Sequence, residues 1–155
     1  MADLLECLIQ IKGVADTPRR LAARTADICA TPISPAEAQR RVREVTTRLA
    51  EAEMVYRDCL YMMLTVERPA LPEMPGSHPS AGAPLSAAEA AAVFTARRTD
   101  TVKVLEQCSA EQLNRIGVEP SRGPMTVADL VALMLAHDTD SLGDLVAQSF
   151  DAQIR

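Results

Sequence analysis

The stretch GVEPSRGPMTVADLVALMLAHDTDSLGDL, residues 117–145, decides the fold. It opens with a segment rich in Gly and Pro, after which Thr126 precedes Asp129 at the spacing with which helix N-termini cap themselves. Apolar residues then recur every three or four positions, which is typical of an amphipathic helix. We therefore predict a helix over about 125–149. Its inward face holds Leu130, Met134, His137, Ser141 and Leu145.

Three further helices are predicted upstream, over about 2–30, 35–66 and 86–108, with a short turn of helix over 110–115. The later ones open on a serine that is followed three residues on by Glu or Gln, a pattern that caps helices. These serines are Ser34, Ser86 and Ser109. Asp16-Thr17-Pro18 also resembles a helix start, which suggests a bend within the first helix. Strand signals are nearly absent, so the fold class is all-α.

The second and third predicted helices carry inward stripes that are apolar apart from one or two polar members. On the second, the stripe is Val45, Arg48, Ala52, Val55 and Cys59. On the third, it is Phe94, Arg98, Thr101, Val102 and Leu105. An inward-facing Arg is costly unless it is paired or solvated. The hypothesis is therefore that Arg48, Arg98 and His137 converge on a central cavity, with Glu51, Glu53, Asp138 and Asp140 as nearby acidic partners.

Composition fits a helical domain. Apolar residues make up 48% of the 155 residues, aromatic residues make up 3%, and Trp is absent, a balance that favours helix over strand. This length suits one domain spanning residues 1–155. The net charge of −5 comes without a basic stripe, which argues against nucleic-acid binding.

No apolar run reaches the roughly 18 residues that a membrane span needs. The N-terminus also lacks the basic region that opens a signal peptide. A cytoplasmic protein without a membrane partner is therefore expected. The cysteines, Cys7, Cys29, Cys59 and Cys108, form no CxxC pair and suggest buried small apolar residues rather than a disulfide or metal framework.

A proline-rich connection over residues 67–84 joins the second and third predicted helices. Its length suits a crossover between bundle helices. It is either an ordinary surface connection, the favoured interpretation, or a lid over one end of the bundle. His78 lies in it and is expected to be exposed; a loop folded back over the bundle would bring His78 to His137.

Several short motifs occur in an order that resembles the DinB-like family of helical bundles. The most specific is G-x-x-P-x-x-G-x-x-T-x-x-D-L, which runs from Gly117 to Leu130 and is followed by His137-Asp138. Supporting motifs are Thr17-Pro18-Arg-Arg-Leu21, Leu49-Ala-Glu-Ala-Glu53, Glu67-Arg-Pro-Ala-Leu-Pro72 and Phe94-x3-Arg98. The resemblance covers almost the whole chain. It implies a mostly antiparallel four-helix bundle with a long crossover between the second and third helices, often as a homodimer.

The same resemblance implies a divalent metal held by three histidines, one on the second helix and an H-D-x-x-H pair on the last. Here the first position of that pair is His137, the second is Ser141, and the position on the second helix is Arg48. A guanidinium does not lose its proton in proteins and cannot act as a ligand. The prediction is therefore that the metal site is degenerate and that no cofactor is bound.

Candidate site residues follow from these positions. His137, Arg48, Ser141 and Tyr56 are the candidate catalytic residues; Arg98, Arg48, Met134 and Cys59 are the candidate substrate-binding residues. Structural alternatives remain open for them. Arg48 would extend its charge from the end of the bundle to water, His137 would be a hydrogen-bonded core residue, and Ser141 a small core residue. Tyr56, Met134 and Cys59 are also explained by packing alone.

Three classes of function remain. The first is a metal-independent cyclase, isomerase or transferase, or a binding protein, that takes a small anionic or carbonyl-bearing organic molecule at Arg48 and His137. The second is a non-catalytic dimeric scaffold. The third is a divalent-metal-dependent thiol transferase like its relatives, with ligands from Asp or Glu. Retained polar residues on inward faces favour the first, because an abandoned site drifts towards apolar filling.

Overall fold

The computed structural model describes residues 3–76 and 85–154 and confirms the helical bundle. Its long helices are α1 (Leu4–Cys29), α2 (Pro35–Thr65), α3 (Ala87–Glu106) and α5 (Val127–Ile154). A single turn, α4 (Ala110–Leu113), and a small hairpin of β1 (Ile116–Glu119) and β2 (Gly123–Thr126) lie between α3 and α5. Within residues 3–76 and 85–154, none of the helices combines the length and the apolar composition of a membrane span.

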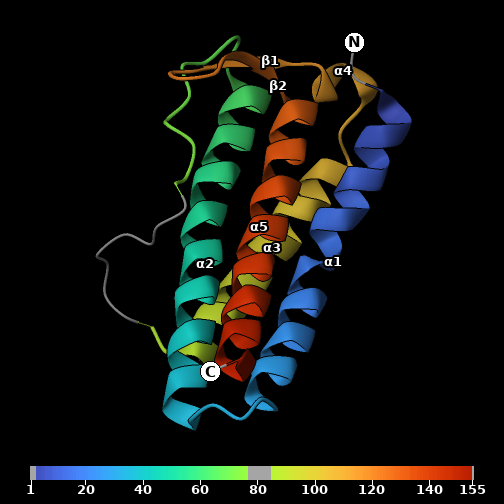
Figure 1. The fold of residues 1–155 in the computed structure, drawn as a ribbon. Helices are drawn as coiled ribbons and strands as arrows, with labels where there is room; N and C mark the ends of the chain where they lie inside the picture. The colour runs from blue at the N-terminus through green and yellow to red at the C-terminus, as the bar shows by residue number, and fades with distance from the viewer. Residues whose placement is uncertain (1–2, 77–84, 155) are drawn as a thin grey trace.

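The direction of the helices explains the long connection between α2 and α3. In Figure 1, α1 runs down from the labelled N-terminus and α2 returns upward, so these two helices are antiparallel. Helices α2 and α3 run in the same direction, and α5 comes back down between α1 and α2. Since α2 ends at one end of the bundle and α3 begins at the other, the connection must run the length of the bundle. The predicted crossover is thus confirmed.

The predicted capping signals stand at the starts of the helices. The side chains of Ser86 and Ser109 accept hydrogen bonds from the backbone N–H groups of Glu89 and Gln112, respectively. In return, the side chains of Glu89 and Gln112 accept hydrogen bonds from the N–H groups of the two serines. Ser34 accepts from the Glu37 N–H, with Pro35 at the first helical position. These caps satisfy N–H groups that have no partner within the helix. The starts of these helices can therefore be predicted from the local sequence.

The hairpin was not predicted. Its strands pair antiparallel, and Gly123 adopts a positive φ of 77° at the turn, a conformation that suits glycine. The buried Glu119 carboxylate closes the turn by accepting hydrogen bonds from the Ser121 and Arg122 N–H groups at 3.0 and 2.6 Å. Beside it, Leu71 N–H donates to the Val118 carbonyl at 2.8 Å. The strands were missed because they are short and lie in a Gly- and Pro-rich segment.

The predicted first helix, over about 2–30, is confirmed, and Asp16-Thr17-Pro18 does not begin a new helix. These residues lie inside α1, which runs without interruption from Leu4 to Cys29 with Pro18 in its interior. Proline has no N–H and leaves the carbonyl four residues earlier without its usual partner. That carbonyl belongs to Val14, and it accepts a hydrogen bond from the Arg98 guanidinium at 3.0 Å instead. This contact with α3 thus compensates for the hydrogen bond that Pro18 removes from α1.

Candidate functional site

A cavity of about 240 Å³ lies between α2 and α5, beside residues 74–76 of the crossover. Helix α2 contributes Arg48 and Tyr56, and α5 contributes His137 and Ser141. The crossover contributes Met74, Pro75 and Gly76, and the turn of the hairpin contributes Arg122. The remaining lining residues, all on α5, are Leu133, Ala136, Asp140 and Asp144. The sequence-predicted catalytic residues therefore meet at one place.

Arg48 is the main charged group of this cavity. Only 13% of its side chain is exposed, and its Nη1 donates to Asp144 Oδ2 at 2.7 Å. Its Nε is buried and has no hydrogen-bond partner among the described residues. The expected acidic partners were Glu51, Glu53, Asp138 and Asp140. The partner observed is Asp144, which lies seven residues after His137 and therefore on the same face of α5.

His137 presents both ring nitrogens to the interior of the protein. Nδ1 and Nε2 are buried, and neither has a hydrogen-bond partner among the described residues. The Tyr56 ring packs edge-on against the imidazole, with 5.9 Å between ring centroids and 74° between planes. Burial lowers the pKa of His137, an effect that the neighbouring Arg48 reinforces and Asp138 opposes. The imidazole is therefore neutral at pH 7, with one nitrogen free to accept a proton.

Tyr56 and Ser141 add two uncharged polar groups to the lining, and both are almost fully buried. Burial raises the pKa of Tyr56, and the charge of Asp138 adds to that shift. The phenol therefore stays protonated and able to donate a hydrogen bond. Ser141 lies one helical turn after His137 on the same face of α5. The hydroxyl, phenol and imidazole thus surround the cavity close to the guanidinium of Arg48.

Three predicted substrate-binding residues do not line this cavity. Met134 and Cys59 are buried in the apolar core, where they pack with the residues around Val131 and Met63. Arg98 is 1% exposed and belongs to a separate polar cluster. Arg98 therefore does not converge with Arg48 and His137. His78 lies outside the described residues.

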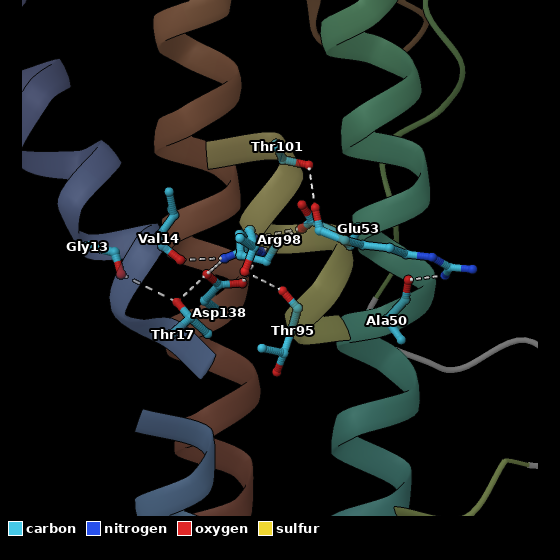
Figure 2. A network of polar contacts seen from close by, with 11 residues as sticks. Gly13, Val14, Thr17, Ala50, Glu53, Thr95, Arg98, Thr101 and Asp138 are labelled. Carbon is cyan, nitrogen blue, oxygen red and sulfur yellow. Dashed lines mark hydrogen bonds and ion pairs between the residues drawn. The ribbon is translucent and has the colours of Figure 1, made fainter. Parts of the chain in front are cut away.

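The second polar centre is a buried ion cluster around Arg98 (Figure 2). Its guanidinium lies between Glu53 of α2 and Asp138 of α5, with Nη2 at 2.7 Å from Glu53 Oε2 and Nη1 at 2.6 Å from Asp138 Oδ2. Both carboxylates are fully buried. Burial acts to lower the pKa of Arg98, but the two carboxylates outweigh it, so the group stays charged. This cluster joins α2, α3 and α5 through charge.

Two residues of α1 complete the cluster. The Thr17 hydroxyl donates to Asp138 Oδ2 at 2.6 Å, and Arg98 Nη1 donates to the Val14 carbonyl that Pro18 leaves free. All four long helices therefore contribute a polar group (Figure 2). The motifs at Thr17-Pro18, Glu53, Arg98 and Asp138 meet here rather than at the cavity. Through these side chains the four long helices are joined in the interior of the bundle.

Replacing Thr17 with valine is expected to lower the free energy of unfolding by about 1–3 kcal/mol. Valine has nearly the same shape but removes the hydroxyl that donates to the buried Asp138 carboxylate. Urea unfolding of the two proteins measures the difference. Thr17→Ser keeps the hydroxyl and serves as the matched control. A Thr17→Val variant as stable as the parent protein would show that this hydrogen bond contributes little.

The residues at the three positions implied as metal ligands do not suit a cation. Arg48, His137 and Ser141 all line the one cavity, so the positions themselves are brought together. However, a guanidinium carries a positive charge and has no lone pair to donate. Among residues 3–76 and 85–154, no group of three or more His, Cys, Asp or Glu side chains is placed to hold a metal ion. The donors present therefore do not fit a divalent metal in the usual way.

Comparison with known proteins agrees with the fold. The family model of the DinB superfamily matches residues 30–145. A solved structure described as "YfiT from Bacillus subtilis is a probable metal-dependent hydrolase with an unusual four-helix bundle topology" is similar, with a TM-score of 0.78 and 15% sequence identity. The likeness covers 99% of this chain and 91% of that one, and at this identity it shows the fold alone. No curated protein sequence matches the chain.

Proposed function

The chain belongs to the DinB superfamily, and from that premise we propose that it keeps the family's bundle while its cavity binds a small organic molecule without a metal. Arg48 supplies the fixed positive charge where the family resemblance implies a cation. The ligand is a small anion or a carbonyl compound whose oxygen develops negative charge. Arg48 and His137 are the residues that recognise it.

One observation carries this proposal. Three nitrogen atoms, Arg48 Nε and both ring nitrogens of His137, are buried beside the cavity without a partner in the described part of the chain. Buried polar groups in folded proteins are nearly always hydrogen-bonded, because leaving one unpaired costs about 1–3 kcal/mol. Three such atoms at one cavity indicate a site that is completed by a ligand. An abandoned site would have been filled with apolar side chains.

The chemistry available at this cavity is proton transfer beside a fixed charge. A neutral His137 acts as a general base, while Arg48 stabilises negative charge that forms on an oxygen atom. Tyr56 remains a hydrogen-bond donor. No hydrogen bond joins Ser141 to His137 among the described residues, so Ser141 is assigned to hydrogen bonding of the ligand rather than to nucleophilic attack. These roles suit an isomerase, a cyclase or a transferase that moves a proton.

Replacing Arg48 with alanine is expected to abolish the binding of small organic anions, since no other cation in the cavity is comparably buried. A screen of organic acids, phosphates, aldehydes and ketones by thermal unfolding measures the effect, because a ligand that binds only the folded state raises the midpoint. Arg43→Ala, an exposed position on the same helix, is the matched control. A ligand that raises the midpoint equally in Arg48→Ala and in the parent protein would place its site elsewhere.

The alternative, a metal-dependent function, is tested by measuring the metal content. Elemental analysis of the purified protein, before and after incubation with zinc and with nickel, is expected to find far less than one metal ion per chain. A near-stoichiometric content would overturn the metal-independent proposal. It would instead support a metal-dependent activity of the kind named for the protein from Bacillus subtilis, or a thiol transferase with carboxylate ligands.

A non-catalytic scaffold is the second candidate, and an exposed apolar patch at the start of α1 favours it. Leu5 is 68% exposed and Ile9, one turn later, is 61% exposed, with Leu4 and Leu8 beside them. Contiguous apolar surface of this kind often marks a contact between proteins. Sedimentation analysis distinguishes a dimer from a monomer. A dimer that binds none of the screened compounds would support the scaffold over the ligand-binding function.

A further inference from the structure

We propose that the cavity recognises a carboxylate, which binds side-on to the Nε–Nη2 edge of Arg48, and that Asp144 is a positioning residue that holds this edge towards the ligand. This inference rests on the proposed function, because it specifies the ligand of the same cavity. It goes further in naming one chemical group, one edge of one side chain and a role for Asp144.

The contacts of Arg48 separate its two edges. Asp144 engages Nη1 alone, through Oδ2 at 2.7 Å. On the other edge, Nε is buried without a hydrogen-bond partner in the described part of the chain. Other arginines of this chain use that edge fully: Arg19 binds Asp16 through Nε and Nη2 at 2.6 and 2.8 Å. At Arg48 the bond to Asp144 uses Nη1, and Nε has no such partner among the described residues.

The shape of this edge selects the ligand group. Nε–H and Nη2–H point in parallel, which matches the two oxygens of a carboxylate and gives a pair of charge-assisted hydrogen bonds. A single carbonyl oxygen satisfies only one of these donors. The cavity, at about 240 Å³, lies below the roughly 300–1,000 Å³ that is typical of sites for drug-sized ligands. The expected ligand is therefore a small carboxylic acid.

Asp144 fits a positioning role better than that of a competitor. Its side chain is 53% exposed, whereas that of Arg48 is 13% exposed. The partly exposed Asp144 carboxylate thus binds one end of the buried Arg48 guanidinium and limits its rotation. Because Asp144 uses Nη1, it leaves the side-on edge to the ligand. Removing Asp144 would free the guanidinium to turn, so binding would weaken.

The test follows the Arg48 Nε–Hε signal by nuclear magnetic resonance of the full-length protein, with benzoate, succinate and pyruvate as probes. Each acid has its neutral amide as the control. The acids are expected to shift this signal, which is assigned by its loss in Arg48→Lys, and the amides are not. Arg48→Lys keeps the charge but loses the parallel donors, so it is expected to weaken binding of the acids by about tenfold or more, as loss of 1.4 kcal/mol would. Asp144→Ala is expected to weaken it several-fold.

Each of the other outcomes would refute one specific part of this proposal. Equal binding of the acids by Arg48→Lys and the parent protein would refute side-on recognition, and tighter binding by Asp144→Ala would make Asp144 a competitor. Amides or other neutral compounds that perturb the His137 signals but leave Arg48 Hε unmoved would refute the carboxylate and leave the proposed function standing. If no compound perturbs either residue, both the carboxylate and the proposed function are wrong.

Discussion

Replacing Arg98 with methionine is expected to lower the free energy of unfolding by about 3–5 kcal/mol. The change leaves Glu53 and Asp138 buried without the guanidinium that lies between them. It also removes the donor to the Val14 carbonyl, which has no N–H partner within α1 because of Pro18. Denaturant unfolding followed by circular dichroism measures the loss. Few single substitutions in a domain of this size have a larger effect.

The neighbouring arginine gives a matched control. Arg97 is half-buried and donates to the Ala50 carbonyl at 3.2 Å, with no salt bridge to a carboxylate of residues 3–76 or 85–154. Arg97→Met is therefore expected to cost at most about 1 kcal/mol. If Arg98→Met does not fold, Arg98→Met combined with Glu53→Gln and Asp138→Asn keeps the test open. That variant has no uncompensated buried charge and is expected to recover part of the loss. Equal costs at Arg97 and Arg98 would show that the cluster contributes little.

Placing histidines at Arg48 and Ser141 is expected to create a zinc site. Together with His137, the double variant Arg48→His/Ser141→His supplies three imidazoles around one cavity, the ligand number of open zinc sites. Residues 137 and 141 lie one turn apart on one face of α5, as a shared metal requires. Removing the guanidinium also removes a positive charge that opposes a cation. Near-stoichiometric zinc is expected by elemental analysis, against little or none in the parent protein.

The matched control for the zinc site is Arg48→His/Ser141→Ala, which has the same change of charge but only two histidines. It is expected to bind zinc far more weakly, because one ligand is missing. A double variant that remains as free of metal as the parent protein would show that these positions do not converge as ligands. The proposal that Arg48 stands in for a metal would then lose its basis.

The two arginines on inward stripes show where prediction from sequence stopped. Both Arg48 and Arg98 stand among apolar residues at helical spacing, and the sequence does not separate them. Their roles differ because their neighbours come from other helices. Arg98 meets Glu53 and Asp138 in the interior, whereas Arg48 reaches the rim and meets Asp144. Only packing of the helices decides which carboxylate faces which guanidinium.

The cavity was predicted in part. His137, Arg48, Ser141 and Tyr56 were named from spacing and from the family resemblance, and they do line one cavity. Arg122 and residues 74–76, which complete its wall, carry no signal in the local sequence, because they come from a turn and from the crossover. Asp144 was missed although its place on the face of His137 and Ser141 was available from helical periodicity. The signal for Asp144 is a carboxylate on the same helix face as His137 and Ser141, opposite the predicted inward-facing Arg48.

The helices are predictable from local sequence, because capping, propensity and periodicity act within a few residues of each position. The order of the bundle is predictable as well, because the crossover after α2 is long enough to span its length. Only the tertiary structure supplied the donor to the Val14 carbonyl that Pro18 leaves free, because that donor, Arg98, lies on α3. It also decided the division between a buried ion cluster and a cavity with unpaired polar atoms, because both depend on contacts between residues far apart in the chain.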